Sequence, residues 1–294
     1  MNEDSLRRRA IALYDRFTHE THDRRAFMAD LTRLAGGVAA ANALLGLIAA
    51  NPAAASQIAP NDPRVRTIEL TWPTSVSARK MKGYSARPAV ARGKLPIVLV
   101  IHENRGLNEH IRDMTRRIAL EGFTAVAPDF LTSMGGTPGN EDEARDMIAR
   151  LDLKAAIADG VATIRLMQQP QRSTGRVGVV GFCWGGAMAD QLAIAAGDHL
   201  AAAVSYYGPP PPPAEAAKVK APMLLHYAGL DERVNAAAGP WVAALKAAHV
   251  AVDSYEYPGV NHAFNNDTAI GRYDAAAAAL AWQRTVAFLK LHLA

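Results

Sequence analysis

The stretch Val177-Gly178-Val179-Val180-Gly181-Phe182-Cys183-Trp184-Gly185-Gly186 combines an apolar run with a glycine-rich turn. The apolar run predicts a buried strand, and the small residues that follow predict the start of a helix. Between them, Gly181-x-Cys183-x-Gly185 has the glycine spacing of a nucleophile turn, with a thiol in place of the more common hydroxyl. Side chains two residues before or after the nucleophile would collide in so sharp a bend. We therefore predict that Cys183 is a nucleophile at a strand-to-helix turn.

Two properties of this turn support a reactive thiol. The amides at the start of the following helix stabilise negative charge, which favours the thiolate. Cys183 is also the only cysteine of the chain, so no intramolecular disulfide can form and a thiolate metal cluster is disfavoured. A buried structural cysteine or a phosphate-binding loop are the alternative interpretations of the same glycine pattern.

Outward from this turn, strand and helix patterns alternate from residue 66 to the C-terminus. Apolar or alternating runs predict strands at residues 67–72, 81–85, 96–101, 124–127, 177–180, 202–206, 223–227 and 252–257. Periodic runs predict helices at residues 109–121, 184–196, 240–248 and 274–293, and one long helix or two at residues 141–167. Strands that alternate with helices predict a mostly parallel, twisted sheet with helices on both faces. The first two strands are expected to be antiparallel at the N-terminal edge. With the nucleophile turn, this pattern predicts an α/β-hydrolase fold.

A nucleophilic thiol requires a base, and the base requires a group that orients it. In the α/β-hydrolase fold the acid and the histidine follow the nucleophile in that order along the chain. Asp231 comes directly after a predicted strand, with Glu232 as its rival, and His262 lies in the loop before the last helix. We therefore predict a Cys183–Asp231–His262 triad. An exposed loop histidine without a role is the alternative interpretation of His262.

The loop after the strand at residues 96–101 is expected to complete the site. The backbone N–H groups of Asn104 and Trp184 are predicted to form an oxyanion hole, in which one donor contributes about 3 kcal/mol to catalysis. Glu103 lies beside this predicted hole, so a role in the site is favoured over a surface carboxylate.

Composition limits the possible functions. The chain has 294 residues, half of them hydrophobic, which is enough for a sizeable core in one domain. Its net charge is +4, and the basic residues are scattered rather than gathered in a stripe with aromatic residues. Nucleic-acid binding is therefore disfavoured.

Residues 1–55 differ from the rest of the chain. The pair Arg24-Arg25, the small apolar run at residues 34–50 and the Ala53-Ala54-Ala55 site before Ser56 resemble a twin-arginine export signal. We predict recognition of the precursor by the Tat translocon, a periplasmic mature protein without a stable membrane span, and one hydrolase domain at residues 56–294. A cytoplasmic protein with a retained N-terminal extension, whose amphipathic helix packs on the domain or on a partner, is the alternative.

The motifs resemble those of the dienelactone hydrolase family (carboxymethylenebutenolidases). Five segments occur in family order: residues 102–111 (His-Glu-Asn-Arg-Gly-Leu-Asn-Glu-His-Ile), 127–129 (Ala-Pro-Asp), 181–186, 229–231 (Gly-Leu-Asp) and 261–264 (Asn-His-Ala-Phe). The resemblance spans about residues 66–294. It implies the same triad, with no metal or other cofactor. It also implies that Glu103 interacts with the resting thiol and is displaced when a substrate binds.

The chain departs from that family at two positions where arginines bind the substrate carboxylate. It has Leu131-Thr132-Ser133 after the Pro-Asp motif and Asn265-Asn266-Asp267 after the histidine. We therefore predict a hydrolase that cleaves a small ester or lactone through an acyl-thioester, with chlorinated dienelactone disfavoured as the natural substrate. A thioesterase or another acyl hydrolase on the same fold is the alternative, and a non-catalytic envelope binding protein is a further one.

Overall fold

The computed structural model describes residues 3–19, 23–49, 56–74 and 80–294. Its centre is an eight-stranded sheet with the strand order β1-β2-β4-β3-β5-β6-β7-β8. The strands are β1 (Val65–Pro73), β2 (Lys80–Pro88), β3 (Ile97–Ile101), β4 (Thr124–Asp129), β5 (Val177–Phe182), β6 (Ala202–Tyr206), β7 (Met223–Ala228) and β8 (Val252–Tyr257). β2 pairs antiparallel with both β1 and β4, and every other pairing in the sheet is parallel.

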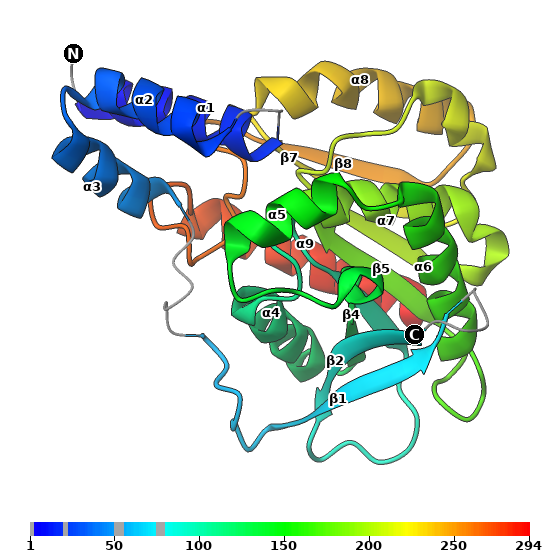
Figure 1. The fold of residues 1–294 in the computed structure, drawn as a ribbon. Coiled ribbons are helices and arrows are strands. Elements are labelled where there is room, and N and C mark those ends of the chain that lie inside the picture. The colour runs from blue at the N-terminus through cyan, green and yellow to red at the C-terminus, as the bar shows by residue number, and fades with distance from the viewer. Residues whose placement is uncertain (1–2, 20–22, 50–55, 75–79) are drawn as a thin grey trace.

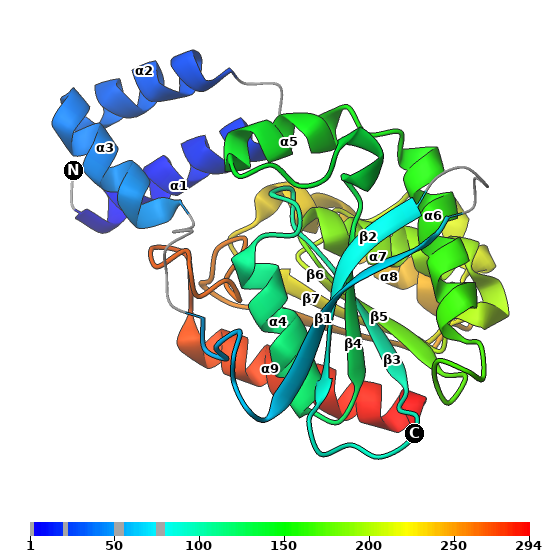
Figure 2. The ribbon, with the colours of Figure 1, turned by 60° about the horizontal axis from the view of Figure 1, so that its bottom comes forward.

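Helices cover both faces of this sheet (Figures 1 and 2). Side chains of α4 (Glu109–Leu120) and α9 (Ala275–Leu293) share one hydrophobic cluster with the sheet, and those of α6 (Leu153–Met167), α7 (Trp184–Ala195) and α8 (Glu232–Ala247) share the other. α5 (Glu141–Ala149) lies over the ends of the strands, and short 3₁₀ turns occur at Thr132–Met134, Gly197–His199 and Pro213–Lys218. Strands β3 to β7 are buried along nearly their whole length, which explains their apolar sequences, whereas β8 at the edge of the sheet is largely exposed or half-buried and more polar.

The predicted α/β-hydrolase fold is confirmed, including the antiparallel strands at the N-terminal edge. The run at residues 141–167, which the sequence left open as one helix or two, is two helices, because the side chain of Asp152 accepts a hydrogen bond from the amide of Ala155 and caps a new helix. One helix boundary differs from the sequence expectation. α8 begins at Glu232 rather than at Pro240, because Asp231 caps it and Pro240 is accommodated inside the helix.

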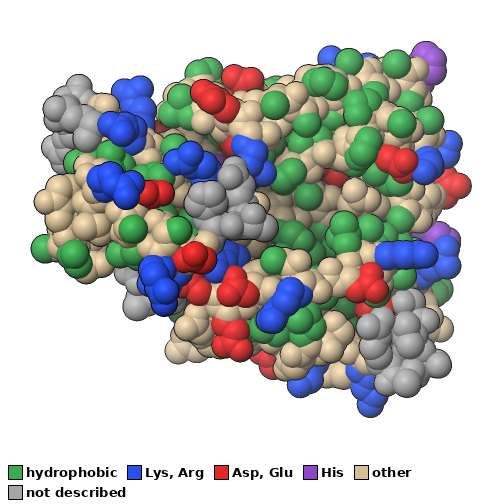
Figure 3. All heavy atoms as spheres, turned by 45° about the horizontal axis from the view of Figure 1, so that its top comes forward, with side chains coloured by type: hydrophobic (Ala, Val, Ile, Leu, Met, Phe, Trp, Pro, Cys, Tyr) green, Lys and Arg blue, Asp and Glu red, His purple; other side chains and the backbone are tan. Residues whose placement is uncertain are grey.

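Three helices form the N-terminal unit, α1 (Glu3–His19), α2 (Arg24–Ala35) and α3 (Val38–Ile48). They have a small hydrophobic core of their own, in which the rings of Phe17 and Phe27 stack with centroids 4.5 Å apart. Lys and Arg side chains gather over this unit at the left of Figure 3. The unit packs beside α5 and beside the loop between β8 and α9 (Figure 2). The N-terminal unit therefore lies near the carboxyl ends of the parallel strands (Figure 2).

Within the described residues, no single helix has the length and apolar character needed to cross a membrane. The pair α2 and α3 reaches the threshold together, but the two helices are bent by 108°. The twin arginines begin α2, whereas the predicted cleavage site lies outside the described residues. The export signal stays a prediction.

Candidate active site

Cys183 occupies a strained turn between β5 and α7. Its backbone has φ 56° and ψ −114°, a conformation that is rare for a residue with a side chain. A Cβ atom at Gly181 would overlap the carbonyl oxygen of Gly185, and one at Gly185 would lie 2.5 Å from the carbonyl oxygen of His102. Both glycines are thus required by the close approach of three backbone segments. The thiol is held at the start of α7 and is 4 % exposed.

Asp231 and His262 form a buried pair beside the thiol. One oxygen of Asp231, Oδ2, lies 2.5 Å from Nδ1 of His262, and the other, Oδ1, accepts a hydrogen bond of 3.3 Å from the amide of Val234. The carboxylate is therefore fixed by α8 and fixes the imidazole in turn. Nε2 of His262 has no hydrogen-bond partner among the described residues. A ring nitrogen of His262 lies within 4.8 Å of the sulfur of Cys183. Glu232, the rival acid, is exposed on the first turn of α8.

The charges of this pair support each other. Burial acts to lower the pKa of His262, but the charge of Asp231, together with Cys183, raises it to about 10. Burial acts in the opposite direction on Asp231, and the charge of His262 outweighs it, so the pKa of Asp231 is lowered from its usual value. A protonated imidazole therefore persists at neutral pH beside an ionised carboxylate.

The predicted oxyanion loop lies against the start of α7, where the ring of His102 stacks on Trp184 with centroids 5.3 Å apart. Trp184 is the first residue of α7, a position where backbone N–H groups lack intrahelical partners. Glu103 is buried, and its carboxylate accepts a hydrogen bond of 2.8 Å from the side chain of Asn266. No hydrogen bond joins Glu103 to Cys183 among the described residues, so the predicted contact with the resting thiol stays a prediction.

Asn266 and Asp267 stand where the resemblance places a substrate-binding arginine, and both have structural partners here. Asn266 holds Glu103, and Asp267 forms an ion pair of 2.5 Å with Arg117 on α4. Neither contact could be predicted from the sequence, because the partners are more than 140 residues apart. These residues therefore organise the loop that carries His262.

His19 is the site residue that sequence reasoning missed. It ends α1, and its two ring nitrogens lie 4.0 Å from the sulfur of Cys183. Its ring centroid is 4.7 Å from that of His262, edge to face. Burial and the neighbouring charge of His262 lower the pKa of His19 well below its usual value, so this second imidazole is neutral.

Donor atoms of His19, Cys183 and His262 lie within 4.8 Å of one another, the spacing of a possible metal site. The sulfur is equidistant from both nitrogens of His19, however, so neither nitrogen lone pair is directed at the point where a cation bound to the sulfur would lie. We assign no metal to these residues.

Comparison with known proteins identifies the family of this chain. The model of the dienelactone hydrolase family matches residues 81–293. The chain belongs to the dienelactone hydrolase family. It is an ester or lactone hydrolase of the α/β-hydrolase fold.

Individual members of the family are similar over most of their length. A "Putative carboxymethylenebutenolidase" of Escherichia coli (strain K12) is 34% identical over 225 residues, which are 71% of this chain and 82% of the relative. The carboxymethylenebutenolidase of Pseudomonas putida is 31% identical over 208 residues, 68% and 87% of the two chains. The crystal structure of a "Putative Dienelactone Hydrolase" from Klebsiella pneumoniae superposes with a TM-score of 0.70 at 29% identity, covering 77% of this chain and 98% of the other. The family match begins at residue 81 and therefore leaves out the N-terminal unit.

Proposed function

We propose that this hydrolase cleaves small esters or lactones through Cys183, His262 and Asp231. The observation that carries the proposal is the chain of contacts from Asp231 through His262 to the thiol. The carboxylate holds Nδ1, Nε2 has no partner in the described part of the chain, and a ring nitrogen of His262 lies within 4.8 Å of the sulfur. A nucleophile, a base and an orienting acid in this order are what acyl transfer requires.

In the proposed reaction, the thiolate of Cys183 attacks the acyl carbon while the proton resides on His262. Collapse of the tetrahedral intermediate breaks the carbon–oxygen bond, and His262 donates its Nε2 proton to the leaving oxygen. The product of this half-reaction is a thioester. Water then attacks the thioester carbon, His262 takes a proton from that water, and the carbon–sulfur bond breaks to release the acid. The backbone N–H groups of Asn104 and Trp184 stabilise the oxyanion in both steps.

Glu103 is proposed to gate this chemistry. Its negative charge disfavours a neighbouring thiolate until a substrate intervenes, and Asn266 anchors the carboxylate in the structure. The gating role follows from the family resemblance.

The test compares the native chain with Cys183→Ala and Cys183→Ser on p-nitrophenyl esters, small lactones and matched thioesters. We expect turnover of oxygen esters or lactones by the native chain and none above background by the alanine variant. Intact mass spectrometry of the quenched native reaction should detect the acyl group on Cys183. Undiminished hydrolysis by Cys183→Ala would refute the nucleophile, and a strong preference for thioesters in competition would replace the substrate class.

A further inference from the structure

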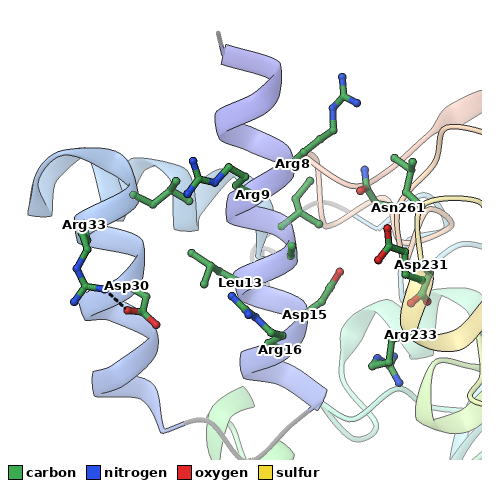
Figure 4. Close-up of a pocket in the computed structure, with 15 residues that line it drawn as sticks. Arg8, Arg9, Leu13, Asp15, Arg16, Asp30, Arg33, Asp231, Arg233 and Asn261 are labelled. Atoms are coloured by element: carbon green, nitrogen blue, oxygen red, sulfur yellow. Dashed lines mark hydrogen bonds and ion pairs between the residues drawn. The ribbon is translucent and has the colours of Figure 1, made fainter. Parts of the chain in front are cut away.

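The C-terminal end of α1 is fixed to the loops that surround the active site. The side chain of Asn104 donates a hydrogen bond of 2.9 Å to the backbone oxygen of Thr18, and Arg105 donates one of 2.9 Å to the hydroxyl of Tyr14. Farther along the helix, a cavity of about 930 Å³ separates α1 from the loop that carries Asp231 (Figure 4). The close contacts of α1 with the hydrolase domain therefore lie in the C-terminal half of the helix.

A second attachment comes from the loop between β8 and α9. Nε of Arg272 donates a hydrogen bond of 2.9 Å to the backbone oxygen of Ile48, and its Nη1 lies 3.6 Å from the carboxylate of Asp15. The amide of Gly271 donates a hydrogen bond of 2.9 Å to the oxygen of Leu47. Because Arg272 is buried and joins both α1 and the end of α3, the N-terminal unit is held from two sides.

This attachment places the ring of His19 in front of the nucleophile. The ring contacts the sulfur of Cys183 and faces His262, as its distances of 4.0 Å and 4.7 Å show. In the proposed reaction the acyl group becomes bonded to the sulfur of Cys183. Side chains that contact this sulfur therefore limit the space that the acyl group can occupy. His19 borders it, although the family match does not include its helix.

We propose that His19 is a wall of the acyl-binding space of this enzyme and restricts it to short acyl groups. The proposal rests on the proposed nucleophilic role of Cys183. It extends the active site to the N-terminal unit and makes His19 a specificity-determining residue. The substrate class that fits is an ester of a small acid or a small lactone, because a long acyl chain on the sulfur would collide with the ring of His19. The hydrogen bond from Asn104 to the backbone oxygen of Thr18 fixes the end of the helix that carries this ring.

The test measures kcat and KM for p-nitrophenyl acetate, butyrate and hexanoate with the native chain, His19→Ala, His19→Phe and Arg16→Ala. The imidazole ring occupies about the space of three methylenes, and each methylene that becomes buried favours binding about fourfold. His19→Ala should therefore raise the hexanoate-to-acetate ratio of kcat/KM by at least about tenfold. His19→Phe keeps a ring at the same position and should retain the preference for acetate.

Arg16→Ala is the matched control, because Arg16 is exposed on the same helix and contacts neither Cys183 nor His262. Its chain-length profile should equal that of the native chain. Thermal melting of each variant verifies the fold, which should persist because His19 is not part of the core of the N-terminal unit. Should His19→Ala prove unstable, His19→Asn provides a second small polar side chain for the same comparison.

A second measurement does not depend on ester hydrolysis. Alkylation of Cys183 by iodoacetamide and by the bulkier N-phenylmaleimide should give a higher maleimide-to-iodoacetamide rate ratio in His19→Ala than in the native chain. If native chain-length and alkylation ratios persist in His19→Ala, the proposed wall is wrong while the triad stands. If the native chain hydrolyses no ester, the proposed function fails, and the alkylation ratio still decides whether His19 screens the sulfur.

Discussion

Replacement of Asp231 by asparagine keeps the size of the side chain and removes the charge that His262 faces. The native geometry raises the pKa of His262 from 6.5 to about 10 despite the burial of its ring. At about 1.4 kcal/mol per pH unit, this rise corresponds to a stabilisation of the imidazolium on the order of 5 kcal/mol, shared between Asp231 and Cys183. An asparagine amide can also donate to Nδ1 and hold the imidazole in the wrong tautomer.

We therefore expect Asp231→Asn to lower kcat/KM by about 10³- to 10⁴-fold, as for the aspartate of a Ser-His-Asp triad. Hydrolysis of p-nitrophenyl acetate at saturating and limiting substrate measures this loss. Glu232→Gln is the control, because it removes an exposed carboxylate one residue away and should keep nearly full activity. Activity within tenfold of the native value in Asp231→Asn, or an equal loss in Glu232→Gln, would refute the assignment of the acid.

The same pair predicts a pH dependence of stability. Because the folded-state pKa of His262 is raised, its stabilising contribution is complete below pH 6.5 and is lost as the pH rises through about 10. The difference in melting temperature between the native chain and Asp231→Asn should therefore shrink between pH 6.5 and pH 10. A difference in melting temperature that grows between pH 6.5 and pH 10 would contradict a raised pKa of His262 in the folded state.

Three further predictions concern two residues of α7 and Glu103. Gly185→Ala should abolish activity and destabilise the fold by several kcal/mol, because its Cβ would lie 2.5 Å from the backbone oxygen of His102. Gly239→Ala is the control, because a Cβ there meets open space, and it should change neither activity nor the melting curve. Asp190→Asn should raise the melting temperature at pH 8 but not near pH 4. Burial raises the pKa of the Asp190 carboxyl well above its usual value, so the contribution of this group to folding stability is complete below pH 3.8 and is lost as the pH rises above it. An equal change in melting temperature at both pH values would contradict this. Glu103→Gln should accelerate alkylation of the free thiol without substrate, because one negative charge near the thiolate is removed, whereas an unchanged rate argues against gating.

Much of the fold could be predicted because it depends on local patterns. Continuous apolar runs identify strands that are buried on both faces, and the close approach of three backbone segments at the nucleophile explains the two glycines around Cys183. The positions of Asp231 in the loop after β7 and of His262 in the loop after β8 could be predicted from the order of the strands along the chain. The start of α8 was missed, because proline usually marks a first helical turn and the capping role of Asp231 depends on its three-dimensional contacts.

The contribution of the N-terminal unit could not be predicted in the same way. His19 is 164 residues from Cys183, and no spacing rule connects a helix end to a nucleophile at that distance. The anchoring of Glu103 by Asn266 is equally non-local. The twin arginines and small residues of this unit predict an export signal, and that pattern contains no information on how α1 packs against the active site.

One loop links the two halves of this arrangement. Residues 258–274 connect β8 to α9, and they carry His262 near one end and Arg272 near the other. A chain cut after residue 55, as the export prediction requires, would keep the three triad side chains but lose the partners of Arg272 and the ring in front of the sulfur. Precursor and processed chain would then differ in selectivity. The shorter chain would accept longer acyl groups, and the loop that carries His262 would be less firmly held. Sequencing the N-terminus of the protein from its native cells identifies which of the two the organism uses.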